Sequence, residues 1–158
     1  MARLSIAQIG FCLASVLTLA SVRAESGPEY LIRLGLQTRA TQADLLLALG
    51  RFAGVGGRES LQRTTELLKK EHLLDPSFQP LPARHVRRGD AALLFARGLR
   101  LEGGVSGWLF GRGRRSAYRE LGDKGIMPPG GENCEMSGAE LLGVLERVRA
   151  YRASGNRL

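Results

Sequence analysis

The sequence predicts a mainly α protein, a compact bundle of short helices in helix–loop–helix repeats that follows a cleaved N-terminal signal peptide. Three observations lead to this fold class. An uncharged stretch opens the chain, a helical spacing of apolar residues recurs three times, and an acidic residue opens each recurrence. Helical spacing gathers apolar side chains on one face, which has to be buried against a neighbour. The chain beyond residue 24 suffices for one domain, 25–158, with a modest core.

The first predicted element is a secretory leader over residues 1–24. Arg3 precedes a stretch without charge from residue 4 to residue 22, and the sequence SVRA at 21–24 has the small residues of a cleavage site. We therefore expect a mature chain that begins at Glu25, is periplasmic, envelope-associated or secreted, and has no stable transmembrane helix. The alternative is a retained membrane anchor, since the stretch is almost long enough to span a bilayer, although its polar residues count against this.

Cleavage leaves 21 Lys and Arg against 15 Asp and Glu, a net charge of +6. A basic protein outside the cytoplasm attracts cell-wall polymers, lipid headgroups or polysaccharides, and nucleic acid is not the expected partner. Of the two cysteines only Cys134 remains, so no internal disulfide is expected. This thiol is either a partly buried side chain or one that pairs with another chain. Nothing in the sequence indicates the oligomeric state.

Three segments, 41–52, 87–98 and 137–148, align with one another. In each, an acidic residue is followed by apolar or small residues at i, i+3, i+4 and i+7 spacing, which predicts a helix with one apolar stripe. The acidic residues are Asp44, Asp90 and Glu140, and the stripes are Leu45, Ala48, Leu49 and Phe52, then Ala91, Leu94, Phe95 and Gly98, then Leu141, Val144, Leu145 and Val148.

Two of these helices have the residues of a capping box at their start. Thr41 precedes Asp44, and Ser137 precedes Glu140, with the spacing at which hydroxyl and carboxylate cap a helix. The middle segment lacks the hydroxyl. We interpret the three acids as helix-start residues and not as catalytic groups.

Shorter elements fill the intervals between these helices. Helices are predicted over 58–73 and 114–124, the second ended by a left-handed Gly125, and each is followed by an aliphatic pair and a Pro-containing loop. Residues 29–37 fit either a helix or a strand. The repeat units are therefore about 29–56, 57–101 and 102–152.

Residues 117–148 carry AYRELGDKGIM, a Gly/Pro loop and SGAELLGVL, and this pattern resembles the S-layer homology (SLH) repeat of bacterial cell-envelope proteins. The match is weaker over 61–99 and fragmentary over 30–52. The resemblance implies three repeats in one helical domain that binds an acidic cell-wall polysaccharide. The family has an Arg in its short motif that helps bind the polymer.

The three positions that match this Arg are Gln42, Arg88 and Gly138, so only Arg88 is carried over as a ligand-binding residue. The family's aromatic residue at the start of its second helix would fall near Gly113 and is absent, with Trp108 a few residues earlier.

Two basic groups are candidate ligand-binding sites. The segment 102–120 combines glycines and aromatic residues with arginines whose forked donors suit carboxylates, phosphates or sulfates. Its composition also fits single-stranded nucleic acid, or a plain linker with buried aromatics and solvated arginines. The second group precedes the middle helix. The candidates are Trp108, Arg112, Arg114 and Arg115 in the first group, and Arg84, Arg87 and Arg88 in the second. Phe110 in the first group is a second stacking face, and His85 in the second is interpreted as a solvated loop residue.

No pattern of catalytic residues is present. The two histidines stand in unrelated contexts, no zinc spacing or nucleophile elbow occurs, and the Gly-rich segment lacks the Lys and Ser/Thr of a P-loop. We therefore expect no enzyme activity, no metal and no cofactor. Two hypotheses follow: an SLH-like, envelope-associated module that binds an anionic cell-wall polymer or an envelope partner, or a secreted or periplasmic basic adaptor that holds a protein segment between helices.

Overall fold

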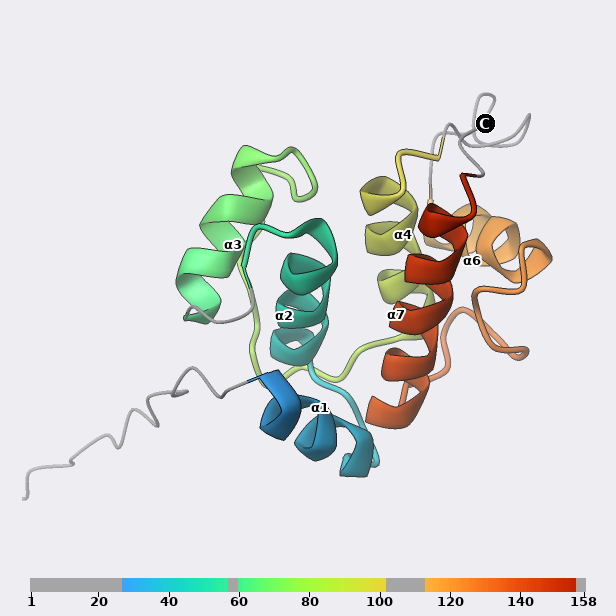
Figure 1. Cartoon of the computed structure of the whole chain (residues 1–158), viewed down its shortest axis with the longest axis horizontal. Coiled ribbons are helices and arrows are strands. Elements are labelled where there is room, and N and C mark those ends of the chain that lie inside the picture. The colour runs from blue at the N-terminus through green and yellow to red at the C-terminus, as the bar shows by residue number, and fades with distance from the viewer. Residues whose placement is uncertain (1–26, 57–59, 102–112, 156–158) are drawn as a thin grey trace, which may run out of the picture.

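The computed structural model describes residues 27–56, 60–101 and 113–155, and these form six α-helices and no strand (Figure 1). The helices are α1 (Gly27–Leu36), α2 (Gln42–Ala53), α3 (Leu61–Lys70), α4 (Arg88–Gly98), α6 (Arg114–Asp123) and α7 (Gly138–Ala153). The prediction of a mainly helical protein is confirmed, and residues 29–37, for which helix and strand both stood open, belong to a helix. The predicted leader, 1–24, lies outside the described residues.

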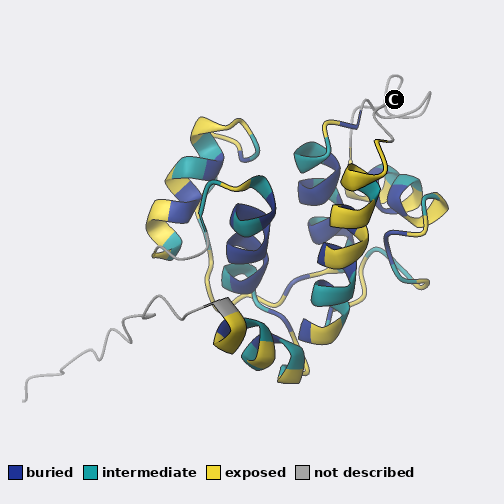
Figure 2. Ribbon diagram, in the orientation of Figure 1, coloured by how far each residue is buried: buried dark blue, intermediate teal, exposed yellow. Residues whose placement is uncertain are grey.

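Three helices, α2, α4 and α7, form the centre of the molecule and run in the same direction (Figure 1). Each remaining helix packs on one of them: α3 on α2, α6 on α4, and α1 on α7. The predicted stripes of the three central helices are buried, except that Gly98 is half-buried (Figure 2). These stripes meet in one core, because an amphipathic helix has to bury its apolar face against its neighbours.

The starts of the central helices follow the predicted capping chemistry. The Thr41 hydroxyl accepts from the Asp44 N–H at 3.3 Å, while the Asp44 carboxylate accepts from the Thr41 N–H at 3.0 Å. Ser137 and Glu140 repeat both bonds at 3.2 and 2.9 Å. Helix α4 begins after Arg87 without a side-chain cap, as expected where the hydroxyl is missing.

A ring of three backbone hydrogen bonds joins the residues that precede these three helix starts. The Ala40 N–H donates to the Met136 carbonyl at 2.7 Å, the Met136 N–H donates to Val86 at 3.0 Å, and the Val86 N–H donates to Ala40 at 2.9 Å. All three residues are buried. Because a buried backbone group without a partner is costly, the ring both satisfies these groups and fixes the three helix starts beside one another.

The turns after α3 and α6 have the same hydrogen bonds. The N–H groups of Leu73 and Leu74 both donate to the Leu68 carbonyl, and those of Ile126 and Met127 both donate to Leu121. Each turn contains one residue with a left-handed backbone. This residue is His72 after α3, with φ of 57°, and Gly125 after α6, with φ of 69°. The predicted terminator Gly125 is thus confirmed, and a histidine holds the matching conformation after α3.

Candidate functional site

The starts of the central helices meet loops from elsewhere in the chain at three junctions, and these junctions differ. At the start of α7 the end of α1 lies directly on the helix. The Gly138 N–H donates to the Gln37 carbonyl at 3.0 Å, and a Cβ atom on Gly138 would overlap the Leu34 carbonyl. No side chain fits at this position, which accounts physically for the glycine.

At the junction of α4 and α7, Arg88 fills the space with its own side chain. Its Nη2 donates to Glu140 Oε1 at 2.6 Å and its Nη1 donates to the Pro129 carbonyl at 2.7 Å. Only 14% of the Arg88 side chain is exposed, and its Nε is buried without a partner. The residue therefore links the first turn of α4 to the loop before α7 and to the first turn of that helix.

Arg88 and Glu140 each stabilise the charged form of the other. Partial burial raises the pKa of Glu140, but hydrogen bonds from the Ser137 N–H and the Arg88 guanidinium outweigh it, so the pKa lies below its ordinary value. Burial likewise lowers the pKa of Arg88, while the hydrogen bond and charge of Glu140 raise it by more. Both groups are consequently held in their charged forms, as a charge-assisted hydrogen bond requires.

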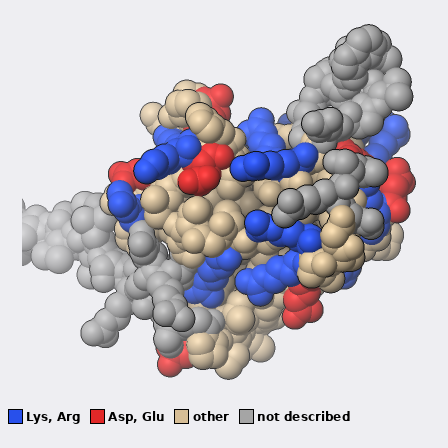
Figure 3. All heavy atoms as spheres, turned by 45° about the horizontal axis from the view of Figure 1, so that its top comes forward, with Lys and Arg blue, Asp and Glu red and all other residues tan. Residues whose placement is uncertain are grey.

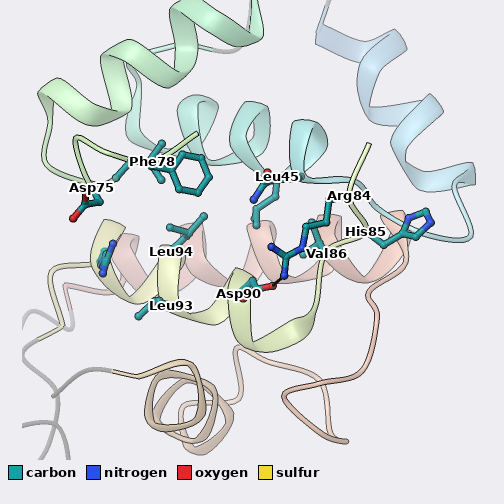
Figure 4. Close-up of a pocket in the computed structure, with 12 residues that line it drawn as sticks. Leu45, Asp75, Phe78, Arg84, His85, Val86, Asp90, Leu93 and Leu94 are labelled. Carbon is teal, nitrogen blue, oxygen red and sulfur yellow. Dashed lines mark ion pairs between the residues drawn. The ribbon is translucent and has the colours of Figure 1, made fainter. Parts of the chain in front are cut away.

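The junction of α2 and α4 is open. A groove of about 190 Å³ lies between these helices and the loop of residues 74–86 (Figure 4). Gln42 ties the loop to α2, because its Oε1 accepts from the Leu81 N–H at 2.5 Å and its own N–H donates to the Arg84 carbonyl at 2.8 Å. These two bonds of Gln42 thus fix the position of the loop beside the groove.

The groove combines an apolar floor with a charged rim. Apolar side chains of α2 and of the loop face those of α4 across it (Figure 4). The floor is Leu45, Leu74, Phe78, Val86, Leu93 and Leu94, and the rim is Gln42, Asp75, Arg84, His85, Asp90 and Arg97. An apolar surface with a few polar groups around it is the usual composition of a ligand site.

The rim carboxylates are already engaged. Asp90 lies 3.2 Å from the Arg114 guanidinium and 4.0 Å from that of Arg84. Hydrogen bonds from the side chain and the backbone of Ser77 hold the pKa of Asp75 below its ordinary value. Arg97, by contrast, forms no ion pair within the described ranges. The cations of the rim therefore keep donors for an anionic group, although two acids moderate the local charge.

Apart from Arg88, which links α4 to α7, the predicted site residues fall into three sets. Arg84 and His85 line the groove, and Arg114 lies next to it through Asp90. Arg87 and Arg115 are exposed at the starts of α4 and α6 and do not line the groove. Trp108, Phe110 and Arg112 lie outside the described residues.

Sequence reasoning missed several lining residues, of which Phe78, Asp75 and Arg97 are the most informative. The only available signal was Phe78 itself, a single aromatic residue within a polar, Pro-containing loop. Its place in the groove depends on contacts of that loop with α2, which no local pattern reveals.

Within the described ranges, no group of three or more His, Cys, Asp and Glu side chains could hold a metal ion. The helices of those ranges are all too short or too polar to cross a bilayer. No family model, curated protein or solved structure matches the chain.

Proposed function

We propose that the protein is a non-catalytic, exported module of the cell envelope, SLH-like in architecture, whose groove between α2 and α4 binds one unit of an anionic envelope polymer. The observation that carries this proposal is the open junction between α2 and α4. Of the three junctions at the starts of the central helices, one is filled by Arg88 and another is covered by α1, while this one has an apolar floor and a rim with Arg84 and Arg97.

Cyclic packing supports a repeat architecture. Each outer helix packs on the central helix of the preceding unit, with α1 on α7 closing the circle, and the bonds among Ala40, Val86 and Met136 have the same circular order. The turns after α3 and α6 are equivalent in their hydrogen bonds. Three helix–loop–helix units around one core account for all of these contacts, and they agree with the SLH resemblance of the sequence.

The size of the groove limits the ligand. A volume of about 190 Å³ is below the 300–1,000 Å³ of common ligand pockets, so one sugar unit or one side chain fits. A sugar offers an apolar ring face to Leu45 and Phe78, and a carboxylate on it would face the arginines. The net positive charge of the chain favours this anionic ligand.

A second candidate function uses the same groove. An adaptor that binds a protein segment would place an apolar side chain on the floor, and the rim, which has both acids and arginines, suits a peptide with both charges.

Salt distinguishes the two functions. Retention of the purified protein on sheared envelopes should fall steeply with ionic strength if an anionic polymer is bound, whereas a groove filled by apolar anchors should respond little. Phe78→Ala is the variant that reports on the groove in both cases. Normal retention of this variant at low salt would rule out the groove as the binding site.

A further inference from the structure

Four arginines gather at the end of the central helices opposite the three junctions. Arg97 and Arg100 lie at the end of α4, and Arg149 and Arg152 lie in the last turns of α7. We call these four residues the arginine face. Figure 3 brings this end of the molecule forward and shows basic side chains spread over the middle of the view.

The sequence of α7 places two of these arginines directly beyond its buried stripe. The buried stripe of this helix includes Leu145 and Val148, and the next positions at helical spacing are Arg149 and Arg152. The Arg152 guanidinium lies 5.5 Å from the centre of the Phe52 ring in α2. A Cβ atom on Gly98, at the end of α4, would lie 3.1 Å from the same ring. The ring of Phe52 therefore joins the ends of all three helices beneath the arginines.

Within the residues that the structure describes, no ion pair joins the arginine face to a carboxylate. Among the described residues, ion pairs join Arg33 to Asp44, Arg39 to Glu135, Arg63 to Glu66, Arg84 and Arg114 to Asp90, and Arg88 to Glu140. None of them involves the arginine face. Most lie near the starts of the central helices, where acids also stabilise the positive helix ends. Among the described residues, the paired charges therefore lie mostly near the starts of the central helices, and the arginines at their other end form no ion pair.

Helix ends reduce this excess without cancelling it. Each helix C-terminus carries roughly half a negative charge, so three of them offset about one and a half of the four positive charges. Asp75 adds a further negative charge near Arg97. After the hydrogen bonds from Ser77, the charge of Arg97 also contributes to lowering the pKa of the Asp75 carboxyl. A net positive surface remains, and its guanidinium donors make no hydrogen bond within the part of the chain that the structure describes.

We propose that the arginine face binds the continuing chain of a linear polysaccharide that carries carboxylates along its length. This proposal rests on the proposed function and extends it, because Arg97 belongs both to the rim of the groove and to the arginine face. One end of the polymer occupies the groove, and the following units pass over the arginines. Guanidinium groups suit this ligand because each binds a carboxylate with two parallel donors.

Other polyanions fit this surface less well. Insertion into a lipid surface needs exposed apolar side chains, and the large ones that are exposed among the described residues, Ile32, Leu36 and Leu81, lie on α1 and on the loop before α4, away from the arginine face. Stacking of nucleobases needs an open aromatic platform, but of the described aromatic residues near this end Phe52 is buried and Tyr151 is half-buried beside Lys124. A carboxylated polysaccharide needs neither.

The test compares long and short polygalacturonate, a linear carboxylated polysaccharide, as ligands of the whole protein. The face variant is Arg100→Gln/Arg149→Gln, because both side chains are exposed. The charge-matched control is Arg63→Gln/Arg119→Gln, two exposed arginines on α3 and α6. We expect the face variant to bind the long polymer about tenfold more weakly, with a smaller salt dependence, since two exposed charge contacts are lost. It should bind an oligomer of two or three units as the unaltered protein does.

Equal affinities of the face variant and the unaltered protein for the long polymer would overturn the proposal, as would an equal loss in the control. Absence of binding by the unaltered protein would also overturn it. The groove is tested separately by Phe78→Ala. Suppose that this variant keeps full affinity for the short oligomer while the face variant loses affinity for the long polymer. The binding role proposed for the groove is then wrong, and the one proposed for the arginine face is supported.

Discussion

The guanidinium of Arg88 lies 2.6 Å from the carboxylate of Glu140, and this contact connects the first turns of two central helices that are far apart in the sequence. Glu140 also caps its own helix by accepting from the Ser137 N–H. One carboxylate thus stabilises the start of α7 and binds α4. The arginine that sequence similarity assigns to ligand binding is engaged in holding the bundle together, and its role toward a ligand stays a prediction.

Removal of this arginine should therefore destabilise the protein. Arg88→Ala removes the arginine donor from Oε1 of Glu140 and from the Pro129 carbonyl, and we expect the free energy of unfolding to fall by about 2 kcal/mol. Urea unfolding followed by circular dichroism measures this change. The control Arg115→Ala removes an exposed arginine and should alter stability by less than about 0.5 kcal/mol. Equal stabilities of the two variants would show that the Arg88 contacts contribute nothing.

The same pair predicts an acid-sensitive contribution to stability. The pKa of Glu140 is lower in the folded protein than its ordinary value, so its stabilisation is complete above the unfolded pKa of about 4.3 and is lost as the pH falls through the folded pKa. Glu140→Gln should therefore be less stable than the unaltered protein at pH 7, and this difference should shrink toward pH 3. Urea unfolding at both pH values checks this, and a constant difference would contradict it.

Two glycines of α7 should respond oppositely to alanine. At Gly138 a methyl group would overlap the Leu34 carbonyl, so α1 has to shift, and we expect Gly138→Ala to cost about 3 kcal/mol. At Gly143 the nearest atoms belong to the flexible end of Arg147, 3.5 Å away, and Gly143→Ala should stabilise the helix by about 0.5–1 kcal/mol. Thermal unfolding of both variants measures the contrast. A stable Gly138→Ala protein would mean that α1 does not lie against the start of α7.

The equivalent turns after α3 and α6 predict a stabilising substitution. His72 has a left-handed backbone, which costs an L-residue about 1–2 kcal/mol, whereas glycine adopts it freely. We expect His72→Gly to raise the free energy of unfolding by up to about 1 kcal/mol. The converse change, Gly125→Ala, should lower it by a similar amount. A destabilised His72→Gly protein would show that the histidine side chain contributes more than its backbone costs.

The central helices could be predicted because their signals are local. Each has an acidic residue in its first turn and a buried stripe at helical spacing, and two have a capping box. For the residues of α1 the sequence fits either a helix or a strand, and this has a physical reason. The apolar α1 residues Ile32 and Leu36 are 66% and 80% exposed, so they add apolar positions that obscure the spacing of the buried Tyr30 and Leu34.

The candidate site could be predicted only in part. Arg84 was predicted because basic residues cluster before the middle helix, whereas its neighbour His85 was interpreted as a solvated loop residue. Phe78 was not predicted because the position of its loop depends on the hydrogen bond between Leu81 and Gln42, two residues that are far apart in the sequence. The partner of Arg88 could not be read from the sequence either, since Glu140 comes to it only through the packing of α4 and α7.

The most direct test of the proposed function is an NMR titration of the protein with oligomers released from its own purified envelope polymer. We predict that the largest amide shifts occur around the groove, at Leu74, Phe78, His85 and Asp90 and along α4 to Arg97, and that they disappear at high salt. Shifts confined to α1 or α6, or shifts at the groove that high salt does not reduce, would contradict the assignment of this groove to an anionic envelope polymer.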